Sequence, residues 1–216
     1  MKSQKGKLYI GEVIHLFRFW AKAEGIEVEM VNANKVPKVE KVSRLVRACR
    51  IDKEIIIVES LFYCALRNKE LVLLKVGDFD FELNKVYIRK ETAKYESKGF
   101  VPLNLIYAGH VRTYILENDL DEEDYLLNYG NQRKPYSTRR IRAVVNEIAK
   151  RVGLKNIYPH MLRHARARWL LYNGYSMDYV KRFLRHKKIS TTIDVYGEYD
   201  DEEFMRKSKE GVQVVL

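Results

Sequence analysis

Apolar residues recur along most of this chain at the three- to four-residue spacing of amphipathic helices. The first such stretch covers residues 8–23. Residues 26–37 keep no sustained helical period and contain two Asn and a Pro, a composition typical of a linker. We therefore place a domain boundary near residue 35, with a small helical piece and linker in residues 1–35 and the main domain, with a C-terminal tail, in residues 36–216.

The main domain is predicted to be mainly helical with one small sheet. Residues 85–89 and 99–103 have strand-like sequences on either side of a polar turn, which predicts a β-hairpin. Helices are predicted at residues 39–48, 53–66, 68–74, 106–118, 138–152, 159–172, 177–184 and 191–199. The expected fold class is α+β, mainly α-helical, with a small antiparallel β-sheet or hairpin.

Length and composition are those of an ordinary globular domain. The 216 residues can bury one good core but hardly two full domains, and their apolar share is 46%. No apolar run approaches the roughly 18 residues that span a bilayer, and the N-terminus lacks the apolar stretch of a signal peptide. We expect a cytoplasmic protein with no membrane partner.

The two cysteines, Cys49 and Cys64, are too few and too isolated for a disulfide framework or a zinc site. Both lie in apolar helical patterns, so they are predicted to be buried core thiols. The sequence therefore indicates neither a structural metal nor redox chemistry.

Positive charge is concentrated in one stretch. The net charge is +11, and residues 131–188 alone contain sixteen Lys and Arg against two acids. A cationic face of this density is typical of proteins that bind a polyanion, because neutralised phosphates release condensed counterions. The alternative is solvated charge without a partner. Residues 117–124 hold six acids in eight positions and are predicted to form a solvated loop that faces away from the polyanion.

Two side chains suited to an anion fall at the start of the helix predicted at residues 159–172. Pro159 suits the first helical position, where its missing N–H costs nothing. His160 and Arg163 would then share a face near the helix N-terminus, where free backbone N–H groups favour an anion. The alternative is that His160 caps the helix and Arg163 makes a surface ion pair.

A second guanidinium, that of Arg67, follows a strongly apolar helix and precedes Glu70. A guanidinium can donate two parallel hydrogen bonds to two phosphate oxygens and keeps its charge at all relevant pH values. The competing interpretation is an internal pair between Arg67 and Glu70, three residues apart. Both can hold, if Glu70 orients the turn while Arg67 reaches outward.

These residues resemble the tyrosine recombinase (phage integrase) family over about residues 35–200. The matching motifs are Cys64-Ala-Leu-Arg67, His160-x-x-Arg163, His186 and Ser190-Thr-Thr-Ile-Asp-Val-Tyr196. The resemblance implies that the hydroxyl of Tyr196 attacks a scissile DNA phosphate, displaces the 5′-oxygen and leaves a 3′-phosphotyrosine. It also implies that Arg67, Arg163 and His186 bind the non-bridging oxygens. His160 would act as a base or hydrogen-bond partner.

A lysine on the hairpin protonates the leaving 5′-oxygen in this family. The resemblance implies Lys94 for this role, since it lies eight residues before the proline of the second strand. Lys90 and Lys98 remain alternatives. Tyr199, three residues after Tyr196, is the rival nucleophile.

The chain departs from the family pattern at several points. Arg185 stands where many relatives have Gly before the second His, and Cys64-Ala65 replaces the usual Thr-Gly. Arg185 could add a contact to the DNA backbone or alter the local turn. Residues 1–35 resemble only the last piece of the family's core-binding domain, so we expect weak and strongly salt-dependent DNA binding.

The resemblance implies double-stranded DNA as the partner, with no cofactor, metal or small-molecule ligand. The expected DNA contacts are Arg133, Lys134, Arg139, Arg140, Arg142, Lys181, Arg182, Arg185 and Lys187. Related recombinases form cyclic tetramers in which a C-terminal segment passes to a neighbouring protomer. We therefore expect a homo-tetramer on DNA and a monomer in its absence, with the tail docked either in trans or on its own domain.

The expected function is a site-specific recombinase or integrase that cleaves and rejoins DNA through a 3′-phosphotyrosine intermediate. A type IB topoisomerase-like nicking-closing activity would use the same chemistry. An alternative of another class is a DNA-binding regulator in which residues 177–184 and 191–199 form a helix-turn-helix. In that case the array of matching residues, Arg67, His160, Arg163, His186 and Tyr196, would be vestigial. A metal-dependent nuclease is disfavoured, because no carboxylates cluster near the histidines in the sequence.

Overall fold

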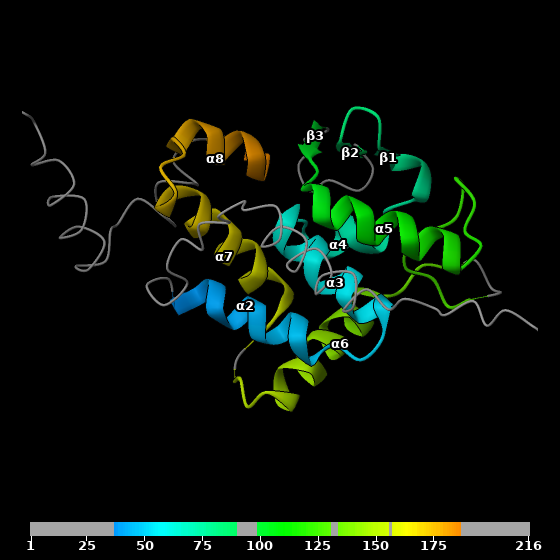
Figure 1. Cartoon of the computed structure of the whole chain (residues 1–216), viewed down its shortest axis with the longest axis horizontal. Helices are drawn as coiled ribbons and strands as arrows, with labels where there is room; N and C mark the ends of the chain where they lie inside the picture. Colours follow the sequence, from blue (N-terminus) through cyan, green and yellow to red (C-terminus); the bar gives the residue numbers. More distant parts are fainter. Residues whose placement is uncertain (1–36, 90–98, 131–133, 156, 187–216) are drawn as a thin grey trace, which may run out of the picture.

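The computed structural model describes residues 37–89, 99–130, 134–155 and 157–186, which form a mainly helical domain with one small sheet (Figure 1). The helices are α2 (Pro37–Ala48), α3 (Asp52–Tyr63), α4 (Asn68–Val72), α5 (Leu105–Glu117), α6 (Thr138–Arg151), α7 (Pro159–Tyr172) and α8 (Met177–Leu184), with a short 3₁₀ helix, η2 (Val76–Asp78). The strands are β1 (Phe79–Asp80), β2 (Lys85–Ile88) and β3 (Gly99–Pro102). The predicted fold class is confirmed.

Most helix boundaries agree with the sequence pattern to within a few residues, and α7 and α8 agree at both ends. The clearest difference is the helix predicted at residues 53–66, which ends at Tyr63. Ala65 adopts a positive φ of 47°, so the chain turns sharply there instead of continuing the helix. The helices predicted at residues 8–23 and 191–199 lie outside the described residues.

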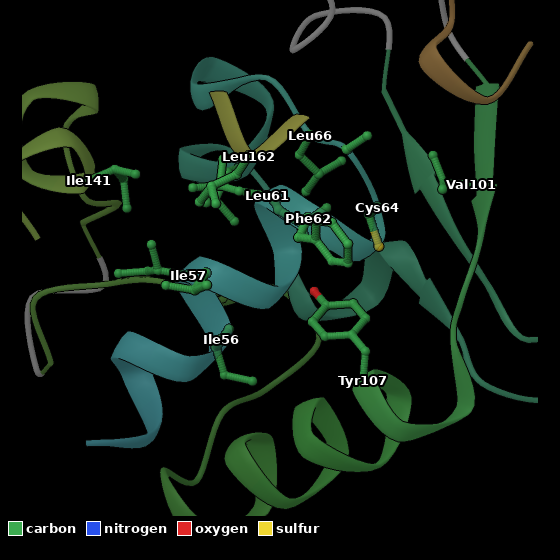
Figure 2. Close-up of a cluster of buried hydrophobic side chains, with 14 of the residues drawn as sticks. Ile56, Ile57, Leu61, Phe62, Cys64, Leu66, Val101, Tyr107, Ile141 and Leu162 are labelled. Carbon is green, nitrogen blue, oxygen red and sulfur yellow. The ribbon is translucent and has the colours of Figure 1, made fainter. Parts of the chain in front are cut away.

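Helix α3 is the centre of the core. It packs against α2, α5, α6 and α7, and eight of its twelve residues are buried. Figure 2 shows its side chains Ile56, Ile57, Leu61 and Phe62 among residues of the surrounding helices, Tyr107, Ile141 and Leu162. Because α3 runs through the middle of the domain, the turn that follows it starts from inside the protein.

Both cysteines were predicted to be buried core thiols. Cys64 is fully buried, at the end of α3, and Cys49 is only half-buried. Burial, the largest cause in each case, raises the pKa of both thiols to about 12. The prediction is confirmed for Cys64, and for Cys49 it holds in part.

The predicted hairpin is part of a three-stranded antiparallel sheet in the order β1-β2-β3. Val86 pairs with Val101, and both are buried against the helices. Tyr87 pairs with Phe100 on the opposite face, where both rings are exposed and the Lys85 ammonium lies 4.9 and 5.7 Å from their centroids. Strand β1 is too short to leave an alternating pattern in the sequence.

The acidic segment of residues 117–124 was predicted to be a solvated loop, and this is wrong in part. Asp124 is buried, and the carbonyl oxygens of Glu122 and Asp124 accept hydrogen bonds from the backbone N–H groups of Gly77 and Val76 at 2.8 and 3.0 Å. Backbone pairing with the 3₁₀ helix therefore holds the second half of the segment against the domain.

In the part of the chain that the structure describes, the helices are all too short or too polar to cross a membrane.

Candidate functional site

The turn between α3 and α4 presents Arg67. Residue 67 has extended backbone angles and is the N-cap of α4. Its N–H donates to Glu70 Oε2 at 2.7 Å, and its Nη1 donates to Glu70 Oε1 at 2.7 Å. The Glu70 side chain is 1% exposed and that of Arg67 is 20% exposed. The predicted internal pair therefore exists, and it orients a guanidinium that still reaches the surface.

Arg163 lies inside the protein, with 1% of the residue exposed. Its Nη1 donates to the carbonyl of Ala65, and its Nη2 donates to the carbonyl of Leu184 at 2.5 Å. Ala65 lies in the turn that leads to Arg67, and Leu184 ends the helix that leads to His186. The alternative of a surface ion pair for Arg163 is therefore wrong, since backbone carbonyls from two distant segments hold the guanidinium.

His160 is exposed on the first turn of α7, which begins with Pro159 as predicted. Its ring meets that of His164 edge-on, with centroids 4.3 Å apart. The surrounding protein still removes part of the water from the ring, and this partial desolvation, followed by the charges of Arg163 and Arg67, lowers the pKa of His160 below its ordinary value. The pKa of His164 is lowered to about 4. Burial is the largest cause, followed by the electrostatic effects of His160 and Arg163.

His186 is half-buried just beyond α8, and its N–H donates to the carbonyl of Lys181 at 3.0 Å. Burial lowers its pKa to about 4, with further contributions from Arg163, Arg67, Arg185 and His160 in that order. These charges act on one imidazole because the three segments that carry them converge there. The structure thus brings together the four described members of the sequence array.

Arg185 was predicted either to contact the DNA backbone or to alter the local turn, and in the structure its side chain is bonded inside the protein. The residue is 7% exposed, and its Nη2 donates to Glu70 Oε2 at 2.6 Å. It ends α8 in the left-handed conformation, with φ 56° and ψ 44°, which is the conformation that glycine adopts without strain at the end of a helix. The extra cation faces inward, toward the same carboxylate that orients Arg67.

The other basic residues mark a surface near the site. Those exposed are Lys134, Arg139, Arg140, Arg142 and Arg182, while Lys181 is half-buried. The start of α6 lies beside Arg67, because Asn68 Nδ2 donates to the carbonyl of Thr138 at 3.0 Å. The first turn of α6, which carries Arg139 and Arg140, therefore begins close to Arg67.

Several predicted residues lie outside the described residues, so the structure does not bear on them. They are the candidate nucleophile Tyr196 and its rival Tyr199, the candidate acid Lys94 with its alternatives Lys90 and Lys98, the basic residues Arg133 and Lys187, residues 1–36 and the tail. Within the described residues, no group of three or more His, Cys, Asp or Glu side chains could hold a metal ion.

Two residues of the site had no assigned role in the sequence interpretation. His164 meets His160 edge-on, and the spacing of four residues on one helix is the signal that could have indicated this contact. Arg166 lies among aromatic rings, 4.5 Å from the Trp169 centroid and 5.5 Å from that of Phe183. It helps to join α7 to α8, since these rings belong to the two helices.

Folding stability is expected to fall as the pH drops below 6.5, the ordinary histidine pKa, toward 4. In that range the unfolded chain binds protons at His164 and His186 that the folded protein does not bind, so acid favours unfolding. Well above pH 6.5 neither state holds these protons and the effect disappears. Chemical unfolding at pH 7 and pH 5 measures the loss, and His186→Gln or His164→Gln should make the dependence shallower. Identical pH profiles in wild type and both variants would contradict the assignment.

Comparisons with known proteins agree with this geometry. A family model described as "Phage integrase family" matches residues 36–203. Tyrosine recombinase XerC of Staphylococcus epidermidis is 32% identical over 141 residues, which are 63% of this chain and 46% of that protein. Tyrosine recombinase XerA of Thermococcus kodakarensis is 29% identical over 216 residues, 94% of this chain and 74% of that protein. The chain thus spans about half the length of the first of these relatives.

Solved structures share the fold. The crystal structure of XerA recombinase matches with a TM-score of 0.71 at 22% identity, covering 95% of this chain and 76% of that one. The XerH site-specific recombinase bound to palindromic difH substrate matches with a TM-score of 0.66 at 18% identity, covering 92% and 64%. These likenesses extend to the whole helical domain and its sheet.

Proposed function

Because this chain belongs to the phage integrase family, we propose that it is a site-specific DNA recombinase that cleaves and rejoins strands through a covalent tyrosine intermediate. The hydroxyl oxygen of Tyr196 attacks the scissile phosphorus and loses its proton, and the bond from phosphorus to the 5′-oxygen breaks. The products are a 3′-phosphotyrosine and a free 5′-hydroxyl. Attack by a 5′-hydroxyl of another strand reverses the step, so no nucleotide is consumed.

The observation that carries the proposal is the convergence of Arg67, Arg163, His160 and His186 from three separate segments. In the proposed role, the two guanidinium groups and His186 contact the non-bridging oxygens of the phosphate. They stabilise the negative charge that grows on those oxygens as the phosphorus becomes pentacoordinate. Arg67 is the more exposed of the two arginines, so its guanidinium is the one that extends toward a phosphate at the surface.

His160 and His186 are suited to act as uncharged imidazoles. Their lowered pKa values leave both imidazoles uncharged near pH 7, so each ring has one N–H donor and one acceptor nitrogen. A neutral His186 can donate to a phosphate oxygen, and a neutral His160 can accept the tyrosine proton. A phenol is a weak nucleophile at neutral pH and needs such a base. Lys94, with Lys90 and Lys98 as alternatives, is proposed to protonate the leaving 5′-oxygen.

Double-stranded DNA is the proposed partner. The exposed basic residues at the start of α6, beside Arg67, support contacts to the phosphate backbone. Solved relatives are described as bound to DNA, among them XerH on difH substrate and the Tn1549 transposon integrase with circular intermediate DNA. We propose the same class of partner here, a homo-tetramer on DNA, and a division of the chain near residue 35 into a helical piece and a catalytic domain.

The test is a covalent adduct. The protein is incubated with nicked duplexes that carry candidate sites, such that cleavage releases a short fragment and traps the intermediate. We expect a denaturant-resistant protein–DNA complex, and peptide mapping should locate the nucleotide on Tyr196. Attachment at Tyr199 would reassign the nucleophile. Relaxation of supercoiled plasmid without a specific site would indicate nicking-closing activity instead, and binding without any adduct on cognate DNA would reject the enzyme.

A further inference from the structure

The side chain of Arg185 connects three parts of the domain. Its Nη1 donates to the carbonyl of Phe183 at 3.1 Å and its Nη2 donates to Glu70 Oε2 at 2.6 Å. Its aliphatic stem passes over β3, since a Cβ placed on Gly99 would lie 3.7 Å from Arg185 Cδ. One residue thus touches the end of α8, the turn that presents Arg67, and the strand that follows the candidate lysines.

Arg185 occupies a backbone position at which glycine would be unstrained. Its φ of 56° lies in the left-handed region, where an L side chain crowds the neighbouring carbonyl. The turn matters for the site because it leads into His186. The backbone N–H groups of Arg185 and His186 donate to the carbonyl oxygens of Arg182 and Lys181, both at 3.0 Å. A buried, charged side chain at this strained position requires compensation, and the ion pair with Glu70 supplies it.

Both carboxylate oxygens of Glu70 accept hydrogen bonds from its two cationic neighbours. Its Oε1 accepts from Arg67 Nη1, and its Oε2 accepts from both the Arg67 N–H and Arg185 Nη2. Without Arg185, the guanidinium of Arg67 would be the one bonded to Glu70 within the described residues, and the carboxylate would cancel its charge. With Arg185, the carboxylate is shared between two guanidinium groups, and a net positive charge remains to attract a phosphate.

We propose that Arg185 is a positioning residue of this site, which holds Glu70 and through it Arg67, and fixes the turn that leads into His186. It acts from inside the protein and not as a DNA contact. The inference rests on the proposed function for its activity measurement, whereas its second measurement uses the free protein alone.

The first measurement is the rate of cleavage of the nicked duplex that traps the covalent intermediate, called the suicide duplex below. Arg185→Gly keeps the left-handed turn but removes the charge and the contact to Glu70, so cleavage should slow about ten- to a hundredfold through loss of alignment. Arg185→Lys should recover part of the rate. In a Glu70→Gln background the further change to Arg185→Gly should have little effect, because both act through the same contact. Arg112→Gln, which removes an exposed charge from α5, should leave the rate unchanged.

The second measurement is the titration of histidine ring protons in the free protein by NMR. The cations that act on His186 are Arg163, Arg67 and Arg185, and the titratable ring of His160 also acts on it. Loss of the Arg185 cation favours the imidazolium form, so the pKa of His186 should rise from about 4 in Arg185→Gly. His164 is the internal control, since burial, His160 and Arg163 determine its pKa and Arg185 does not.

The outcomes separate the two proposals. If wild type cleaves DNA while Arg185→Gly cleaves at the same rate and His186 titrates unchanged, Arg185 has no positioning role. If wild type cleaves no DNA, the proposed function fails, but a selective shift of His186 still supports the placement of Arg185 and an unchanged His186 still overturns it. If Arg185→Gly does not fold, Arg185→Asn, which also tolerates the left-handed turn, replaces it in both measurements.

Discussion

Arg67→Ala is expected to slow covalent cleavage of the suicide duplex by about a hundred- to a thousandfold while the protein stays folded. The proposed loss is one donor aimed at a phosphate oxygen, and removing such a donor from a comparable charge-stabilising site costs about 3–4 kcal/mol of barrier. The fold should tolerate the change, because the Arg67 side chain is 20% exposed and Glu70 keeps its hydrogen bonds to Arg185 and to the backbone of residue 67.

Matched variants separate this role from a general charge effect. Arg67→Lys retains the charge but not the planar fork of donors, so it should recover only part of the rate. Arg112→Gln removes one positive charge elsewhere on the domain and should cleave like wild type. Tyr196→Phe lacks the proposed nucleophile, so its cleavage rate gives the background of the assay. An Arg67→Ala protein with an unchanged melting temperature and a wild-type rate would remove Arg67 from the proposed mechanism.

Glu70→Ala is expected to lower the free energy of unfolding by about 3–5 kcal/mol, the usual cost of breaking a buried ion pair by deleting one partner. Two guanidinium groups depend on this carboxylate, and that of Arg185 is buried with it. Burial raises the pKa of Glu70, but Arg185, Arg67 and Arg163 outweigh that effect and lower it overall, so the group is ionised at neutral pH. Chemical unfolding at pH 7 measures the loss.

A second ion pair of similar geometry provides the comparison. Glu54 accepts two hydrogen bonds from Arg151 at 2.6 and 2.8 Å, but the two side chains are 10% and 18% exposed. Water can solvate Arg151 when its partner is lost, so Glu54→Ala should cost clearly less than Glu70→Ala. Equal losses in the two variants would mean that burial does not set the cost at Glu70.

Sequence patterns predicted the helices well where an apolar stripe faces a single core. Helix α7 begins at the predicted Pro159, and α8 has both predicted ends. The pattern failed at the end of α3, since residues 64–66 are apolar and read as more helix. All three are buried, but in a turn, and Ala65 takes a left-handed conformation that local sequence does not demand. Tertiary packing around Arg163, whose guanidinium bonds the Ala65 carbonyl, favours that turn.

Arg67, His160, Arg163 and His186 could be named as candidates from the sequence, but their burial could not, and neither could the contacts of His164 and Arg166. Spacing put His160 and Arg163 on one helix near its start, yet one is exposed and the other is enclosed. Arginine is usually found on surfaces, and here the carbonyls of two remote segments help to compensate for its burial. The inward direction of Arg185 was hidden for the same reason, because its partner Glu70 lies 115 positions earlier in the chain.

The two carbonyl bonds of Arg163 also have a consequence for how the domain folds. The bond to Leu184 joins consecutive helices 21 residues apart, whereas the bond to Ala65 spans 98 residues and cannot form until the turn after α3 has met α7. Contacts of such long range close late, because the entropy of the intervening loop is lost before any bond compensates for it. Local contacts alone therefore cannot complete the candidate site, and its appearance during refolding would mark the docking of α7 onto the first third of the domain.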